Sequence, residues 1–175
     1  MAACLDDVHA ADARRSGSDA DRGVIVPVNG TNLDAAARVH ALSWRASHRA
    51  ICAASFVAQH TACRQRAYIR GKLDTGSRFW LFVQSGVPAG VVSVTAGQIG
   101  DLYVLPALQG RGIGTRLLRH AMDACAGPCT LWVLASNAGA QRLYVRCGFR
   151  PTGNRIVHPG WIDELEYAGP DARKT

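Results

Sequence analysis

The spacing of apolar side chains changes along the chain from a helical period to an alternating one. Residues 33–44 (LDAAARVHALSW) carry apolar side chains at broadly helical spacing, which predicts a helix, and a second helical stretch covers about 54–73. The segments 78–84 (RFWLFVQ) and 89–95 (AGVVSVT) flank the turn SGVP and are rich in β-branched and aromatic residues. They predict a β-hairpin, and a short strand at 23–28 precedes all of these elements.

The second half of the chain alternates strands with helices. A β-rich run over 98–106 ends at Pro106, glycines follow it, and the next helix breaks at Gly127-Pro128. The pattern then predicts a strand, a short helix and two extended segments, at residues 130–135, 137–148, 150–156 and 163–169. This order predicts a mixed α/β fold around one sheet.

The composition is that of one globular domain. The 175 residues are 48% hydrophobic and 19% charged, and Asn32 offers a cap for the first helix. Residues 1–22 are rich in Ala, Asp and Ser without a sustained period, so we expect a mobile tail there and the folded domain over 23–175. We find no secretory signal pattern and no apolar run of the roughly 20 residues that span a bilayer. The sequence therefore predicts no membrane association.

The six cysteines are scattered, which is typical of reduced thiols in a cytoplasmic protein rather than of a disulfide framework. Cys125 and Cys129 are closely spaced, but no second Cys/His pair completes four ligands, so we expect no metal site.

The formal net charge is +7, and it is unevenly distributed. Residues 1–22 contain five aspartates and three arginines, so the remaining residues carry a net charge of +9. A basic domain favours anionic partners such as nucleic acid, anionic lipid or a phosphate-rich cofactor. The arginines are dispersed and no basic helix is present, which disfavours nucleic-acid binding.

The stretch 108–117, LQGRGIGTRL, places three glycines at alternate positions between a strand and a helix. Backbone N–H groups in this context hold phosphate groups. A Walker A loop is excluded because no Lys-Ser/Thr pair follows the last glycine. A dinucleotide fingerprint fails in both registers, which would require glycine at Thr115 or at Leu117.

Two motifs closely resemble those of the GNAT superfamily of N-acyltransferases. The first is Q-x-x-G-x-G, matched by Gln109, Gly112 and Gly114. The second is N-x-x-A-x-x-L-Y-x-x-x-G-F, matched by Asn137, Ala140, Leu143, Tyr144, Gly148 and Phe149. The resemblance implies a single GNAT-like domain, whose central, mostly antiparallel sheet is flanked by helices and whose splayed strands hold acyl-CoA.

The resemblance also implies a binding site for acetyl-CoA as co-substrate. The loop backbone and the following helix N-terminus would form an anion cradle for the pyrophosphate, and the main chain before the loop would pair with the pantetheine arm. Asn137 would bond the pantetheine or would simply cap its helix. The residues so implied are Leu102, Tyr103, Val104, Gln109, Gly110, Arg111, Gly112, Ile113, Gly114 and Asn137.

In the family Tyr144 corresponds to the tyrosine that commonly protonates the leaving sulfur, although it also suits a core aromatic. The general base stays open. Some relatives carry a glutamate where this chain has Gln98, and ribosomal N-terminal acetyltransferases carry one where it has Trp132. Neither side chain accepts a proton from an ammonium. The remaining candidates are a water chain and Asp101, His48, His158 and Glu164.

The acceptor pocket in this fold lies between the first two helices and the late hairpin. That implies substrate contacts from Trp44, Arg45, His48, His158 and Trp161, although Trp44 equally suits a core position. The shortage of carboxylates disfavours polyamine or aminoglycoside acceptors, which leaves open a small amine, an amino acid or a neutral drug-like amine.

Two rival functions remain from the sequence. One is a regulatory module that binds acyl-CoA without transferring the group, and the other is a transferase that uses a longer acyl-CoA. The resemblance is compatible with a homodimer, because dimers are common among similar proteins.

Overall fold

The computed structural model describes residues 23–125, 127–157 and 163–170. The segment 1–22, predicted to be mobile, lies outside the described residues, as do His158 and Trp161. Among the described helices none is long and apolar enough to cross a membrane. The cysteines at 52, 63, 125, 129 and 147 are free thiols.

One sheet of seven strands, in the order β1-β2-β3-β4-β5-β7-β6, forms the centre of the molecule. All neighbouring strands are antiparallel except β4 and β5, which are parallel. The strands are β1 (Val24–Pro27), β2 (Arg78–Gln84), β3 (Val87–Thr95), β4 (Gln98–Val104), β5 (Thr130–Leu134), β6 (Arg150–Ile156) and β7 (Glu164–Ala168). The helices are α2 (Leu33–His48), α3 (Ala54–Ala58), α4 (Ala62–Asp74), a 3-10 turn (Pro106–Leu108), α5 (Ile113–Ala124) and α6 (Ala138–Arg146). This confirms the predicted mixed α/β class with a mostly antiparallel sheet.

Two local predictions were wrong. The helical stretch over about 54–73 is two helices, because the Thr61 hydroxyl accepts a hydrogen bond from the Arg64 amide and starts α4 anew. Asn32 stands at the N-cap position of α2 but makes no side-chain cap. Its side chain instead bonds the preceding loop, accepting from the Asn29 amide and donating to the Pro27 carbonyl.

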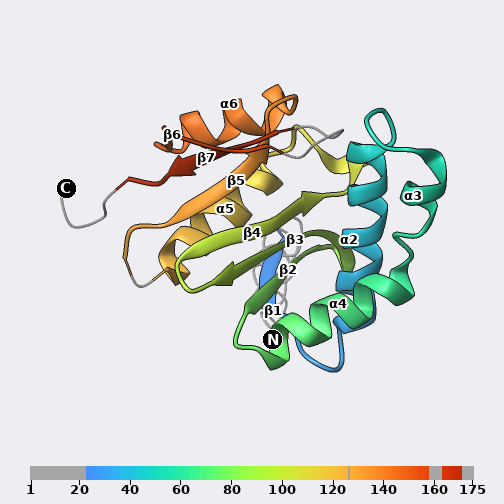
Figure 1. Ribbon diagram of the computed structural model, residues 1–175. Coiled ribbons are helices and arrows are strands. Elements are labelled where there is room, and N and C mark those ends of the chain that lie inside the picture. Colours follow the sequence, from blue (N-terminus) through green and yellow to red (C-terminus); the bar gives the residue numbers. More distant parts are fainter. Residues whose placement is uncertain (1–22, 126, 158–162, 171–175) are drawn as a thin grey trace, which may run out of the picture.

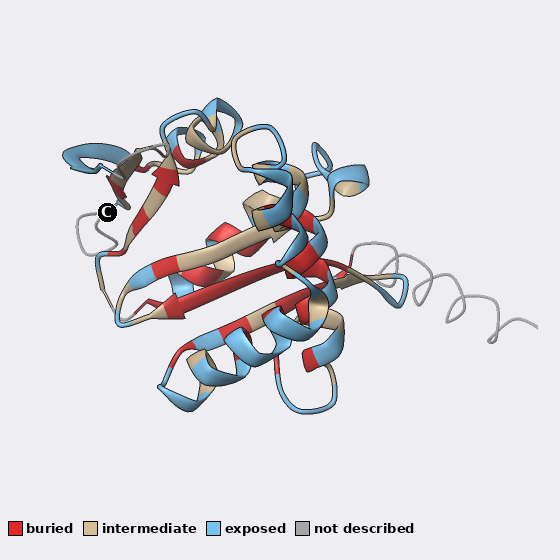
Figure 2. Cartoon of the chain, turned by 45° about the vertical axis from the view of Figure 1, so that its right-hand side comes forward, coloured by how far each residue is buried: buried red, intermediate tan, exposed pale blue. Residues whose placement is uncertain are grey.

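The helices cover both faces of the sheet (Figure 1), so the core has two parts. On one face α2 and α4 pack Leu33 and Ile69 against β2 and β3. On the other face α5 buries Leu117 and Leu118 completely against β3, β4 and β5. Burying each leucine contributes about 1.5–3 kcal/mol. In Figure 2 the central strand β3 is mostly buried, whereas β6 is exposed along its length.

Strands β4 and β5 separate after two residue pairs. Only Gln98 with Thr130 and Ile99 with Leu131 are paired, and beyond them β5 and β7 turn away from β4 toward α6 (Figure 1). The register between β3 and β4 also shifts at this point, and Asp101 takes a positive φ of 41°. The sheet therefore opens on the β5 side of β4 from Gly100 onward.

Candidate functional site

A cavity of about 660 Å³ lies where β4 and β5 separate. Its walls come from β4, the glycine loop, β5, α6 and the C-terminal half of α2, with Glu164 contributed by β7. The predicted residues Leu102, Tyr103, Val104, Gln109, Gly110, Gly112, Gly114 and Asn137 all line it. The two sequence motifs therefore meet at one opening of the sheet.

The glycine loop presents free amides to this cavity. The first helical bond of α5 runs from the Arg116 amide to the Gly112 carbonyl, so the amides before it have no partner within the helix. Gly110 and Gly112 have φ values of 75° and 82°, which favour glycine. A Cβ at Gly114 would lie 3.3 Å from a Leu143 methyl group. Bare backbone at a helix N-terminus suits a pyrophosphate, so the loop fits coenzyme A.

The main chain of β4 continues this site. Leu102, Tyr103 and Val104 lie beyond the last pair with β5, so their backbone is not bonded to that strand. The Gln109 side chain donates to the Val104 carbonyl at 3.1 Å, which fastens the loop to the end of the strand. An extended arm such as pantetheine can pair with the β4 backbone that remains.

Asn137 performs the capping role that the sequence left open. Its Oδ1 accepts the Ala140 amide at 3.0 Å and so caps α6, while the side chain also lines the cavity. Its Nδ2 group is left to donate to a ligand.

Some predicted residues lie elsewhere. Arg45 and Arg111 are not among the described residues that line the cavity. Ile113 is the first residue of α5 and its side chain is buried in the core, so only its backbone amide belongs to the glycine loop. Trp44 and His48 do line the cavity, and they do so from α2.

Tyr144 combines burial with a place on the cavity wall. It is 7% exposed and packs beside Phe149 and Tyr167. Burial raises the pKa of its phenol to about 12, so the proton stays on the oxygen throughout the neutral range. Among the described residues none bonds this hydroxyl, which leaves it available to a ligand.

Asp101 is surrounded by hydrogen-bond donors. Its carboxylate accepts from the hydroxyls of Ser93 at 2.7 Å and Tyr68 at 3.1 Å, and it pairs with His40 Nε2 at 3.1 Å. Burial opposes ionisation, but the hydrogen bond and charge of His40 and the bond from Ser93 outweigh it and lower the pKa of Asp101. The group is a buried carboxylate anion.

Sequence reasoning missed three residues near the cavity. Ser43 and Trp132 line it, while His40 lies behind Asp101. Glu164, a base candidate from the sequence, lines the cavity as well. Trp132 and Leu134 are two residues apart in β5 and therefore lie on the same face of the strand, and Glu164 of β7 is paired with Leu134. The alternation of side chains along a strand was thus a usable signal for these cavity residues. No local pattern indicates the contact between His40 and Asp101.

An aromatic cluster forms the α2 wall of the cavity. The Trp44 ring stacks on His48 at 3.9 Å and on His60 at 3.3 Å between ring centroids, with planes within 7°. Burial lowers the pKa of both imidazoles, although hydrogen bonds to the Trp44 and Phe56 carbonyls act in the opposite direction.

This cluster predicts a loss of stability in acid. Both imidazoles have a lower pKa in the folded chain than in the unfolded one, so the unfolded chain binds more protons below about pH 6.5 and the free energy of unfolding falls. The variant His60→Phe keeps an aromatic ring and should reduce the fall in Tm between about pH 7.5 and 5.5. His120→Phe, on α5 outside the cluster, is the control. Equal falls in both variants would contradict this account.

Comparison with known proteins agrees with the geometry. The model of the acetyltransferase (GNAT) family matches residues 41–149, which is more than half of the chain. A search of curated proteins gave no significant match.

Solved structures of N-acetyltransferases share the fold. PaiA N-acetyltransferase of Thermoplasma acidophilum, in complex with coenzyme A, superposes with a TM-score of 0.66 at 17% identity over 82% of this chain and 97% of that one. The ribosomal-protein-S18-alanine N-acetyltransferase of Escherichia coli gives 0.62 at 21% identity, over 85% and 93%. The putative acetyltransferase yncA of Salmonella typhimurium, with acetyl-CoA, gives 0.62 at 20% identity, over 83% and 92%. The match to the family model, together with the loop and open sheet described above, shows that this chain belongs to the GNAT acetyltransferase family.

Proposed function

We propose that the protein transfers an acetyl group from acetyl-CoA to the primary amine of a small molecule. The observation that carries this proposal is that the glycine loop, the part of β4 that does not pair with β5, and the Tyr144 side chain all line one cavity. A ligand bound along β4 would reach both the loop and the phenol. A cytoplasmic location, which the scattered thiols favour, belongs to the same proposal.

The chemistry needs a neutral amine, support for the oxygen of the reacting carbonyl, and a proton for the departing sulfur. Acetyl-CoA supplies the thioester carbon that the amine attacks. Tyr144 would donate the proton to sulfur, because its phenol is protonated at neutral pH and has no partner among the described residues. The β4 main chain beyond its last pair with β5, from Gly100 onward, would supply the N–H donors to the carbonyl oxygen.

The rest of the cavity supports an amine with an apolar body. Trp44 from α2 and Trp132 from β5 are aromatic lining residues, and Glu164 is a carboxylate on the same cavity walls. The other lining carboxylate, Asp101, already accepts hydrogen bonds from Ser93 and Tyr68, which leaves Glu164 for a ligand. Aromatic faces and one carboxylate attract a single ammonium group with a hydrophobic substituent. A polyamine would require more carboxylates than these walls carry.

The test is a screen of amines with acetyl-CoA, read by mass spectrometry of the products. Phenethylamine, tryptamine, the free amino acids and spermidine serve as acceptors. We expect acetylation of phenethylamine or tryptamine in preference to spermidine. Acetyl-CoA binding without acetylation of any amine would instead favour the regulatory module, and transfer only from a longer acyl-CoA would replace the donor.

A further inference from the structure

Two buried polar atoms of α2 lack a hydrogen-bond partner within the part of the chain that the structure describes. They are His40 Nδ1 and Ser43 Oγ, and both residues are 3% exposed. A serine inside a helix ordinarily bonds a carbonyl of the preceding turn, and Ser43 does not. Because a buried polar group without a hydrogen-bond partner is destabilising, these atoms point to a ligand or water that is held there.

The two atoms can share one bridging oxygen. Residues three apart on a helix have Cβ atoms about 5–6 Å apart, and an oxygen between them can lie about 2.8 Å from each polar atom. Ser43 lines the cavity next to Trp44. A water or a substrate group at Ser43 would therefore adjoin the acceptor amine.

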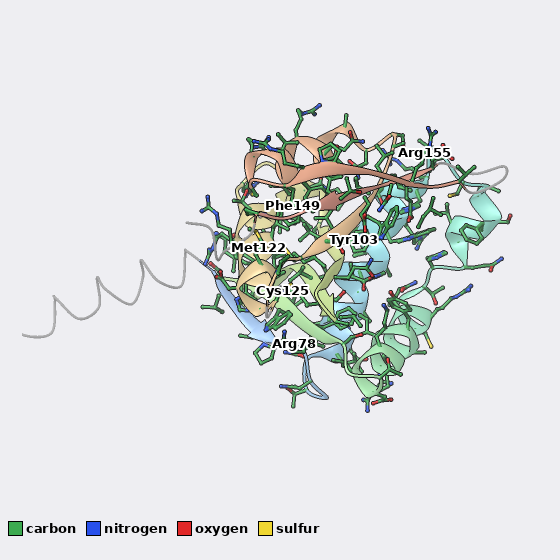
Figure 3. The ribbon with its side chains drawn as sticks, turned by 60° about the vertical axis from the view of Figure 1, so that its left-hand side comes forward. Arg78, Tyr103, Met122, Cys125, Phe149 and Arg155 are labelled. Atoms are coloured by element: carbon green, nitrogen blue, oxygen red, sulfur yellow. The ribbon has the colours of Figure 1, made fainter. Side chains whose placement is uncertain are left out.

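Asp101 fixes which ring nitrogen of His40 is engaged. An ionised carboxylate can only accept hydrogen bonds, so the hydrogen between the two residues belongs to His40 Nε2. Nδ1 is then the other ring nitrogen, and it has no partner among the described residues. The ring of Tyr103, a β4 residue labelled in Figure 3, packs against the imidazole with its centroid 4.7 Å from that of His40.

We propose that His40, oriented by Asp101, accepts the proton that the acceptor amine must lose, through a water or hydroxyl bound at Ser43. This assignment rests on the proposed acetyl transfer. His40 acts through the bridging oxygen, so it is a positioning and proton-accepting residue, while Asp101 keeps its ring in place. His40 Nε2 lies 3.1 Å from the Asp101 carboxylate, which keeps the imidazole oriented.

The protons balance over one turnover. The bound ammonium gives one proton through the bridge to His40, which releases it to solvent. The neutral nitrogen forms a C–N bond to the thioester carbon and the C–S bond breaks. The nitrogen then loses a second proton, and Tyr144 delivers one proton to sulfur and regains another. The products are an amide, free coenzyme A and one proton.

The titratable groups around His40 come from three elements. Asp101 and Tyr103 face it from β4, and Tyr68 faces it from α4, with Lys72 over the Tyr68 ring at 5.8 Å. On α2 itself His48 lies two turns further along. Burial raises the pKa of both tyrosines from a value that is already above the neutral range, so they stay uncharged at neutral pH.

The test compares His40→Gln with His120→Gln, using phenethylamine or the better acceptor from the screen. Glutamine can still donate to Asp101 but cannot accept a proton. We expect kcat of His40→Gln to fall about 100-fold, the size typical of a lost proton acceptor. The acid limb of its kcat–pH profile should disappear, and the acetyl-CoA Kd should stay within about twofold because no CoA contact changes. His120→Gln should match the wild type.

The outcomes separate the two proposals. Wild-type protein that acetylates no amine would overturn both. Wild-type transfer with a His40→Gln variant that keeps its kcat and its acid limb would overturn the role of His40 and leave acetyl transfer standing. If His40→Gln does not fold, Ser43→Ala decides: the assignment requires a lower kcat at unchanged acetyl-CoA Kd, and an unchanged kcat would overturn it.

Discussion

Replacing Tyr144 with phenylalanine should lower kcat by about 10²-fold or more while the Kd for acetyl-CoA stays nearly unchanged. The substitution removes one hydroxyl that none of the described residues bonds and keeps the ring that packs beside Phe149 and Tyr167. The hydroxyl donates its proton to the leaving sulfur in the transition state and not in the ground-state complex. Its removal is therefore expected to lower kcat rather than the affinity for acetyl-CoA. Steady-state kinetics and calorimetric titration of the same preparation measure the two quantities.

Tyr167→Phe is the matched control for this prediction. It is also buried, at 5% exposure, but its hydroxyl donates to Gln141 at 3.5 Å and it does not line the cavity. Its kcat should equal that of the wild type. A Tyr144→Phe variant that transfers acetyl groups at the wild-type rate would remove the phenol from the mechanism.

Gly112→Ala should weaken acetyl-CoA binding at least about tenfold. Gly112 has a φ of 82°, and a Cβ in this left-handed region costs about 1–2 kcal/mol. No atom lies within 4 Å of the added methyl, so the strain arises from the backbone alone. The loop can relieve it only by moving the amides that the phosphates need. Equilibrium dialysis with acetyl-CoA measures the change.

Gly71→Ala provides the control, because it makes the same chemical change in the exposed interior of α4. Gly71 has no positive φ and no atom within 4 Å of the added methyl. Its acetyl-CoA Kd should not change, and its stability should rise by about 0.5–1 kcal/mol. Equal affinities of the Gly112→Ala and Gly71→Ala proteins would contradict the phosphate-binding role of the loop.

The cofactor half of the site could be predicted from the sequence because its determinants are local. Gly112, Gly114 and Asn137 lie at the starts of helices that follow strands through short loops, so their spacing indicates which backbone groups face the opening. The sequence pattern also predicted the strand that carries Leu102 and Val104. The sequence could not decide between the two roles of Asn137, because a helix cap and a ligand contact call for the same residue at the same position. The structure shows that Asn137 caps α6 and also lines the cavity.

The acceptor half depends on contacts between distant segments. His40 and Asp101 are 61 residues apart in the sequence. They come into contact because β4 bulges at Asp101, which has a positive φ. Neither the bulge nor the contact has a signal in hydrophobic spacing, and a histidine among apolar residues of α2 is typical of a core position. Glu164 lies at the cavity because the register of β7 on β5 places it opposite Leu134.

The measurement that tests the central claim most directly is calorimetric titration of the wild-type protein with acetyl-CoA. Saturable binding to one site per chain is the predicted result, since the loop amides and the open edge of β4 form one continuous site. The same titration with coenzyme A should also saturate, because the loop recognises the pyrophosphate. The absence of binding to acetyl-CoA, to coenzyme A and to longer acyl-CoA thioesters would contradict the account.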